Sequence, residues 1–375
     1  MRSWRKLVAI ATATLTLGAL GACSSERTGD AGGDGSAAPS DTLIGISMPT
    51  RSLERWNNDG AHLEGLLKKQ DFQTSLQYAD NQVNQQISQI QNMINDGADV
   101  LVIAAIDGTA LGPVLQQAAD AGIQILAYDR LINGTENVDY YATFDNELVG
   151  TLQGKFIVDQ LDLDNAAGPF NIELFAGSPD DNNARFFFKG AFDVLKPYFD
   201  SGKLVSPSGK VPANIDGWTQ IGIQGWVSAT AQSEMENRLN SFYTDGKKVD
   251  VVLSPNDSLA LGITQALLGA GYTAGDGFPI LTGQDGDVAN VQSIIDGTQS
   301  MTVWKDTRTL GDQVAKMVGQ MVAGEEVSVN DTESYDNGVK VVPAFLLEPQ
   351  VVVRDQIQEK LIDSGFLKAD AVHGL

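Results

Sequence analysis

The sequence has little cysteine, histidine or positive charge. Its 375 residues include one cysteine, Cys23, and two histidines, His62 and His373. A single cysteine excludes an intrachain disulfide and a cysteine metal cluster. Two isolated histidines do not suit a Ser-His or Cys-His catalytic site. Basic residues number 25 against 48 acidic ones, for a formal net charge of −23. Such a surface repels phosphate backbones, so we expect no nucleic-acid partner.

Long hydrophobic runs are also missing beyond the first 40 residues. No later stretch stays apolar for the 18 residues that a spanning helix needs. The acidic surface disfavours electrostatic binding to anionic lipid. Glycine-rich phosphate loops and histidine-rich metal spacings are absent, so we expect no cofactor and no metal.

The N-terminus has the pattern of a secretory signal. Arg2, Arg5 and Lys6 precede an apolar stretch over residues 7–20, which is too short to span a bilayer comfortably. It ends in Leu20-Gly-Ala-Cys23, which resembles a bacterial lipobox. The alternative is an ordinary signal with an incidental cysteine. We expect a signal peptide over 1–22, then a lipidated Cys23 and a flexible Gly/Ser-rich tether over 23–40. The protein would then be extracytoplasmic and anchored to the cell membrane.

The body begins with alternating strand and helix patterns. Apolar stretches over 42–48, 72–78, 100–106 and 123–128 predict strands. Between them lie helical patterns, with one apolar face formed by Val83, Ile87, Ile90, Met93 and Ile94. The continuous apolar run over 100–106 is typical of a strand that is buried on both faces. The alternation predicts a doubly wound parallel sheet.

The alternation then restarts. Strands are predicted over 170–175, 249–254 and 280–282, with helices over 186–195 and 259–268. The length also fits two domains, at about 100–200 residues each. We therefore predict two similar α/β halves with a boundary near 145–150.

Polar and aromatic residues follow almost every predicted strand. Ligands of open α/β sheets bind beyond the carboxyl ends of the strands, so these residues are candidates for one site. The set is Arg55, Trp56, Asp129, Arg130, Asp181, Asn183, Trp226, Asn256, Asp285 and Lys305, with Arg185 and Gln284 expected to support it from behind.

These residue types suit a sugar. Carboxylates and amides accept from hydroxyl groups, Arg and Lys donate to oxygens, and indoles cover C–H faces. Each residue also has a structural explanation that involves no ligand. Asp and Asn after strands are often turn formers or helix caps, Arg130 can pair with Asp129 on the surface, and single tryptophans are usually core residues.

Several short motifs follow one another along the body of the chain. They are Glu54-Arg-Trp56, Ala127-Tyr-Asp-Arg130, Tyr140-Tyr-Ala-Thr-Phe-Asp-Asn146, Gly177-Ser-Pro-Asp-Asp-Asn-Asn-Ala184, Ser254-Pro-Asn-Asp257, Gly283-Gln-Asp285, Val303-Trp-Lys305 and Asn337-Gly-Val-Lys-Val-Val-Pro343. In this order, from about residue 42 to the C-terminus, they resemble the periplasmic-type (type I) sugar-binding proteins of ABC importers, closest to the xylose-binding and multiple-monosaccharide-binding subgroup.

The resemblance implies roles for the candidate residues. The charged and amide groups would bind sugar hydroxyls from both halves, Trp56 would stack nearby and Trp226 would cover the other face. Lys305 would close the site near the hinge. Arg185 stands where hexose-binding relatives have a sugar contact, but the position varies within this subgroup.

The resemblance also implies two lobes joined by a three-segment hinge, with crossovers near residues 147, 305 and 340. One lobe would comprise 41–147 plus 306–340, and the other 148–305 plus 341–375. Lobe closure would bury a monosaccharide, xylose first, then glucose, galactose, arabinose or a uronic acid, and an ABC permease would receive it from a monomeric binding protein.

There are four alternatives to an importer component. Asp129 and Asp285 form a carboxylate pair that suits a glycosidase, but neighbouring Arg130 and Lys305 should keep both ionised. Residues 162–173 have acids at calcium-loop positions one, three and twelve but lack the glycine at six. A sugar-responsive transcription regulator would need a DNA-binding module where the signal and tether lie. A sensor that presents the loaded form to a membrane receptor would use the same site as an importer component.

Overall fold

The computed structural model describes residues 39–375, which belong to one compact unit. The predicted signal peptide, Cys23 and nearly all of the tether fall outside the described residues. Among the residues described, no helix is both long enough and apolar enough to cross a membrane.

The first sheet has six strands, all parallel, in the order β11-β5-β4-β3-β1-β2. Alternate residues of its central strands point to opposite faces, so that Val100 and Val102 enter one core while Leu101 and Ile103 enter another. The strands are β1 (Leu43–Met48), β2 (Gln73–Tyr78), β3 (Val100–Ile103), β4 (Gln124–Tyr128), β5 (Tyr140–Phe144) and β11 (Ala344–Leu347).

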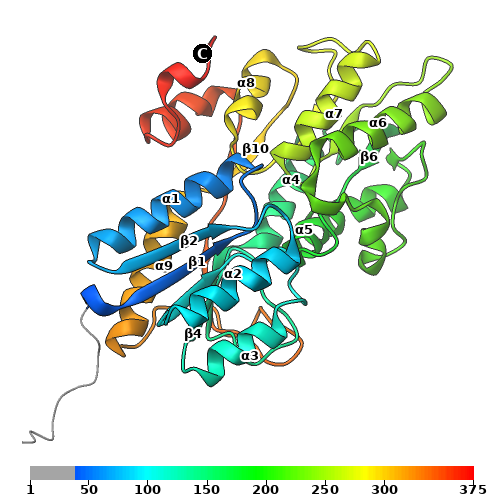
Figure 1. Cartoon of the computed structure of the whole chain (residues 1–375). Helices are drawn as coiled ribbons and strands as arrows, with labels where there is room; N and C mark the ends of the chain where they lie inside the picture. Colours follow the sequence, from blue (N-terminus) through cyan, green and yellow to red (C-terminus); the bar gives the residue numbers. More distant parts are fainter. Residues whose placement is uncertain (1–38) are drawn as a thin grey trace, which may run out of the picture. The chain divides into compact units, whose positions relative to one another are not determined.

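Helices cover both faces of this sheet (Figure 1). One face is covered by α1 (Glu54–Lys69) and α9 (Thr307–Ala323), and the other by α2 (Val83–Asn95) and α3 (Gly112–Asp120). The predicted doubly wound α/β architecture is therefore confirmed.

The second sheet has four parallel strands in the order β7-β6-β8-β9. Five helices accompany it, and one large apolar core joins α4, α5, α6 and α7 to the strands. The strands are β6 (Phe170–Leu174), β7 (Leu204–Val205), β8 (Val251–Leu253) and β9 (Ile280–Leu281), and the helices are α4 (Asn146–Gln160), α5 (Asn182–Asp200), α6 (Ser228–Phe242), α7 (Asp257–Gly269) and α8 (Val288–Asp296).

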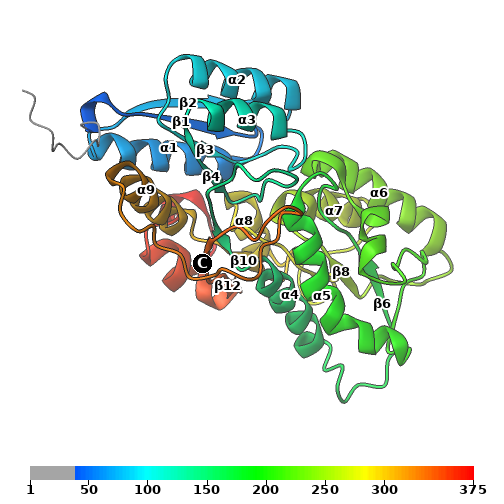
Figure 2. The same ribbon diagram turned by 90° about the horizontal axis from the view of Figure 1, so that it is seen from below.

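A small antiparallel pair, β10 (Thr302–Trp304) and β12 (Gln350–Val352), accompanies the two large sheets. Figure 2 shows this pair and α8 between the helices of the first sheet and those of the second. The C-terminal segment packs on α8, where Ile357, Leu361 and Leu367 share a core with Val291 and Ile294.

Short helical turns complete the described residues. They are η1 (Pro39–Asp41), η2 (Ile215–Ile221), η3 (Gln224–Trp226), η4 (Arg354–Gln356), the π-helical η5 (Gln358–Asp363) and η6 (Ala369–Ala371).

The chain passes between the two sheets three times, and the third passage differs from the prediction. The first falls between β5 and β6, and the second between β10 and α9. The third was expected near residue 340, with 341–375 in the second lobe. Instead, β11 pairs in parallel with β5, with Ala344 opposite Tyr141 and Leu347 opposite Phe144. The chain therefore leaves the first sheet only after Leu347, because 344–347 form its edge strand.

Candidate functional site

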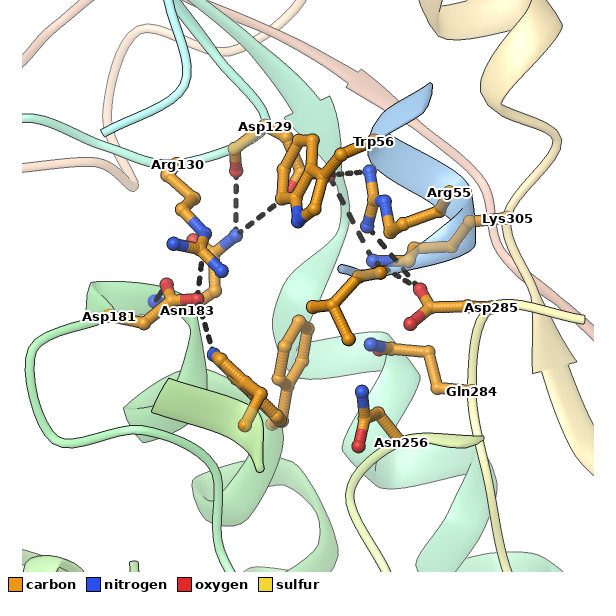
Figure 3. Close-up of a pocket in the computed structure, with 13 residues that line it drawn as sticks. Arg55, Trp56, Asp129, Arg130, Asp181, Asn183, Asn256, Gln284, Asp285 and Lys305 are labelled. Carbon is orange, nitrogen blue, oxygen red and sulfur yellow. Dashed lines mark hydrogen bonds and ion pairs between the residues drawn. The ribbon is translucent and has the colours of Figure 1, made fainter. Parts of the chain in front are cut away.

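A cavity lies at the carboxyl ends of strands from both large sheets (Figure 3). All ten residues predicted to contact a ligand line it, and Gln284, expected behind the site, does so too. The lining is Leu53, Arg55, Trp56, Asp129, Arg130, Asp181, Asn183, Phe187, Trp226, Asn256, Gln284, Asp285 and Lys305.

The first sheet contributes through two strand ends. Helix α1 begins shortly after β1 and places Arg55 and Trp56 in its first turn. Asp129 and Arg130 follow β4 directly. These four residues are all buried, with Arg55 the most exposed at 9%.

The second sheet contributes through helix N-termini and loops. Asp181 caps α5 by accepting from Asn183 N, and Asn256 caps α7 by accepting from Leu259 N at 3.0 Å. Gln284 and Asp285 follow β9, while Lys305 follows β10 of the small antiparallel pair. Asp181 and Asn256 therefore cap helices and line the cavity at once.

One half of the cavity holds a charge network around Arg55. Its guanidinium lies 2.8 Å from Asp129 Oδ2, 3.3 Å from Asp285 Oδ1 and 3.0 Å from Asp59 Oδ2. Lys305 Nζ adds contacts of 3.3 Å to Asp285 and 3.9 Å to Asp129. Figure 3 shows Arg55, Lys305 and Asp285 turned toward one another.

This network sets the ionisation of Asp129. Burial alone would raise its carboxyl pKa, but Arg55 and Lys305 outweigh burial and bring the pKa to about 2. Burial alone would lower the pKa of Arg55, but its three carboxylate neighbours raise that pKa well above the usual value. At neutral pH the cavity therefore presents a carboxylate and a guanidinium that are both charged.

The other half of the cavity links the two sheets. Arg130 Nε lies 2.9 Å from Asp181 Oδ2, and Asn183 Nδ2 donates to the Asp129 carbonyl at 2.6 Å. Burial raises the pKa of Asp181, and Arg130 opposes the rise. Arg130 therefore pairs with Asp181 from the opposite sheet, and not with its neighbour Asp129 as the surface alternative supposed.

Comparisons with known proteins decide the family. The model of the periplasmic binding protein domain matches residues 44–326. The chain belongs to this family. It is 52% identical to the multiple sugar-binding periplasmic receptor ChvE of Rhizobium radiobacter over 328 residues, which cover 87% of this chain and 91% of that protein. The D-xylose-binding periplasmic protein of Escherichia coli (strain K12) is 38% identical over 325 residues, which cover 87% and 91%.

A solved structure agrees with these relatives. An ABC transporter solute binding protein from Clostridium phytofermentans, with bound β-D-glucose, is 51% identical with a TM-score of 0.85. The match covers 88% of this chain and 100% of that one. The predicted kinship with the xylose-binding and multiple-monosaccharide-binding subgroup is therefore confirmed.

In this periplasmic binding protein domain, three cavity residues have left-handed backbones. The φ angles are 59° at Asp129, 57° at Trp226 and 108° at Asp285. Non-glycine residues adopt this region at a cost and concentrate there at functional sites. Tyr141 and Thr143 support Asp129 by donating to its carbonyl at 2.7 and 2.9 Å.

The indole of Trp226 is held by three contacts. Its Nε1 donates to Asp181 Oδ2 at 3.1 Å, and its ring meets Phe187 edge-on with centroids 6.4 Å apart. A Cβ on Gly177 would lie 2.0 Å from the indole, so only glycine fits beneath it. Trp226 is only 5% exposed, and these contacts fix its indole in the cavity wall.

Some buried polar atoms of the cavity have no protein partner. They are Arg55 Nε, Trp56 Nε1 and Gln284 Oε1. Buried polar groups are nearly always hydrogen-bonded, so each such atom calls for a partner that the chain itself does not supply. Figure 3 shows Gln284 and Asn256 side by side near Asp285.

Arg185 does not line the cavity. Its side chain is 43% exposed and lies 3.7 Å from Asp216. On α5 it is two residues beyond Asn183, and residues two apart on a helix face different ways. The geometry gives it no part in holding the residues that do line the cavity.

Two lining residues were not among the candidates. Phe187 lies one helical turn after Asn183, so the i,i+4 spacing was a usable signal. Leu53 precedes α1 and looks like any apolar core residue. Within residues 39–375, no group of three or more His, Cys, Asp or Glu side chains is arranged to hold a metal ion.

Proposed function

We propose that this chain is the extracytoplasmic solute-binding component of an ABC sugar importer and that it binds one monosaccharide between its two sheets. The carrying observation is the cavity itself. Charged donors and acceptors from both sheets converge on it together with two indoles. The 51% identical relative with bound β-D-glucose supports a sugar in this place.

The lining has the chemistry that a pyranose needs. Asp129 and Asp285 accept from hydroxyl groups, while Arg55 and Lys305 donate to sugar oxygens. The unpartnered Gln284 Oε1 would accept from a further hydroxyl. Trp226 would lie against a C–H face of the ring.

The ligand is an unphosphorylated aldose. Xylose and glucose are the first candidates, because the named relatives are a D-xylose-binding protein, a multiple sugar-binding receptor and a protein with bound β-D-glucose. Galactose, arabinose and a uronic acid complete the series to be tested.

Binding would proceed by lobe closure. The pairs Arg130–Asp181 and Asn183–Asp129 join the two sheets directly beside the cavity. If these contacts break, the halves can separate about the three crossovers and admit the sugar; closure then buries it. The closed form is what a permease would receive, from a monomeric protein held to the membrane through Cys23.

The anchor has its own test. Substituting Cys23→Ser in cells should release the protein from the membrane fraction, and a lipid adduct should be found on Cys23 in the wild type by mass spectrometry. Absence of the adduct, with wild type and variant both in the soluble fraction, would leave only the plain secretory signal.

Catalysis on glycosides is not part of this proposal. A general acid must hold a proton near neutral pH, and the Asp129 pKa of about 2 prevents that. Incubation with chromogenic aryl glycosides should give no turnover above a blank, and steady turnover would replace a binding role with an enzymatic one.

A second role uses the same site. One relative is named a receptor, which favours presentation of the loaded form to a membrane sensor alongside import. A pull-down of membrane proteins with and without sugar distinguishes the two, since a sensor and a permease differ in mass and sequence.

A thermal-shift panel tests the binding function. A ligand at 100 times its Kd stabilises the folded state by about 2.7 kcal/mol. At least one of D-xylose, D-glucose, D-galactose, L-arabinose and D-galacturonate should raise Tm by several degrees, and sorbitol serves as the acyclic control. If none of the aldoses shifts Tm, the sugar assignment fails.

A further inference from the structure

Asp257 lies directly after the cavity residue Asn256 but does not line the cavity. Its side chain is fully buried at the start of α7. Within the described residues, no Lys, Arg or His lies within ion-pair distance of its carboxylate. A buried carboxylate without a cation is costly, so its hydrogen bonds need an explanation.

Those hydrogen bonds converge on one loop. Oδ2 accepts from Gly286 N at 2.9 Å and Asp287 N at 3.0 Å, the two amides that follow Asp285. The Asp257 amide in turn donates to the Gln284 carbonyl at 2.9 Å. Hydrogen bonds to Asp257 therefore hold the loop over residues 284–287 on both sides of Asp285.

Two further side chains donate hydrogen bonds to the Asp257 carboxylate. Thr302 donates to Oδ2 at 3.0 Å, and Gln299 Nε2 donates to Oδ1 at 2.9 Å. Asn290 fixes Gln299 by donating to its Oε1 at 2.7 Å. The network therefore joins α7, α8 and β10 to the loop that carries Asp285.

The loop needs this support because its backbone is strained. Asp285 has φ of 108°, a value that side-chain-bearing residues rarely adopt. At Gly283 a Cβ would lie 2.1 Å from Asp257 Oδ1, so the carboxylate fits only against glycine. Without Asp257, Asp287 N would lose this acceptor, and Gly286 N would keep only its bond of 3.2 Å to the Thr302 hydroxyl.

We propose that Asp257 is a positioning residue, which acts through the Gln284–Asp287 loop to hold the Asp285 carboxylate where a ligand needs it. This inference rests on the proposed function, since it takes Asp285 as a ligand contact.

The geometry also predicts a pH dependence. The loop that faces Asp257 carries the carboxyl groups of Asp285 and Asp287. Burial raises the pKa of Asp287 well above its usual value, and the charges of Asp285 and Asp257 add to the rise. Gln299, Asn290 and Thr302 from the other elements are neutral. Burial is the main cause that raises the Asp257 pKa to about 7, and the Asp285 charge adds to it. Beyond Asp285 lie Arg55 and Lys305, which contact Asp285.

Protonation would turn one acceptor oxygen into a donor that faces other donors. Affinity should therefore fall as pH falls through about 7. The contribution of the same group to stability runs the opposite way. Its folded pKa is raised above the unfolded value of about 3.9, so stability from this group is lost as pH rises through about 7.

The test compares Asp257→Asn with Thr264→Val. Asn keeps one acceptor oxygen and loses the other. Thr264 is a matched control, because it is a buried residue of the same helix whose hydroxyl donates to the Thr298 carbonyl at 3.3 Å, away from the loop. Calorimetric titration with D-glucose from pH 6 to 8.5 gives Kd for each protein, and thermal melting checks that each is folded.

We expect the wild-type Kd for D-glucose to rise several-fold from pH 8 to 6. Asp257→Asn should bind at least tenfold more weakly at pH 8 with a flat pH profile, and Thr264→Val should stay within twofold of wild type. In an Asp285→Asn background, Asp257→Asn should add less than threefold, because both act through one carboxylate.

Binding by Asp257→Asn within twofold of wild type, or full additivity with Asp285→Asn, overturns the inference. If Asp257→Asn does not fold, Thr302→Val removes one hydrogen bond to the Asp257 carboxylate and should weaken binding about threefold with a shifted pH midpoint. Unchanged binding by Thr302→Val would again overturn the inference. Absence of wild-type binding to every aldose is a different result, since it rejects the proposed function.

Discussion

Single residues can stabilise local structure and line the cavity at the same time. Asn256 caps α7 with its side-chain oxygen and still lines the cavity. Asp181 caps α5, accepts from Trp226 and pairs with Arg130. A substitution at such a position therefore changes the fold locally as well as the binding surface, and a clean test must choose residues whose local role is small.

Asp129→Asn is the sharpest such substitution. It removes the charge that faces Arg55 and Lys305 while the carbonyl bonds of residue 129 remain. Leaving a buried charged partner short of an acceptor costs about 1–3 kcal/mol, so sugar affinity should fall tenfold or more in calorimetry. Asp96→Asn, at an exposed position beyond α2, should leave Kd unchanged. Near-wild-type affinity for Asp129→Asn would make Asp129 a turn former only.

The effect of Asp129 should not depend on pH near neutrality. Its folded pKa of about 2 lies below the unfolded value of about 3.9, so its contribution is present above that value and is lost as pH falls toward 2. The difference in unfolding free energy between wild type and Asp129→Asn should be constant from pH 5 to 8 in urea titrations. If this difference changed with pH across that range, the pKa of Asp129 would not be near 2.

At the scale of elements, α4 and α5 make the closest helix contact in the second half. A Cβ on Gly150 would lie 1.9 Å from the Phe187 carbonyl oxygen, and one on Gly190 would lie 2.0 Å from the Glu147 carbonyl oxygen. This contact places α5, and with it Asn183 and Phe187, against α4.

Gly150→Ala should therefore lower the free energy of unfolding by about 1–3 kcal/mol, the usual cost of overpacking. Gly65→Ala in α1 is the control, since a Cβ there meets nothing within 4 Å. Removing a glycine from a helix interior should stabilise the protein by about 0.5–1 kcal/mol. Equal effects of the two changes in thermal or urea unfolding would contradict this close packing.

The strand-end rule explains how much of the site the sequence predicts. Carboxyl ends of parallel strands meet at one edge, so Asp129, Asn256 and Asp285 are brought together from positions far apart in the chain. Phe187 and Leu53 are missed because an apolar wall residue resembles a core residue. Arg185 follows the right strand but points away, since helix phase decides its direction.

The third crossover needed information that the local pattern lacks. Residues 344–347 become an edge strand only because they pair with β5, some 200 positions earlier. The left-handed backbones at Asp129, Trp226 and Asp285 are equally hidden, because tertiary hydrogen bonds impose them against the residues' own preference.

At the scale of the whole molecule, the described chain is two α/β halves whose strand ends enclose one cavity. The family and its sugar-binding relatives follow from similarity over most of the chain. The charged pairs Arg55–Asp285 and Arg130–Asp181 each join one half to the other across that cavity. We expect these pairs to be the contacts that a sugar joins on closure and that separate on opening.

Isothermal titration calorimetry with D-glucose and D-xylose tests this account most directly. A single site with a micromolar Kd corresponds to about −8.2 kcal/mol, which several charge-assisted hydrogen bonds with stacking can supply. We predict one sugar bound per chain with a Kd of about micromolar or tighter for at least one of the two, and loss of that binding in Asp129→Asn. No saturable heat with either sugar, or equal binding by wild type and Asp129→Asn, would contradict the account.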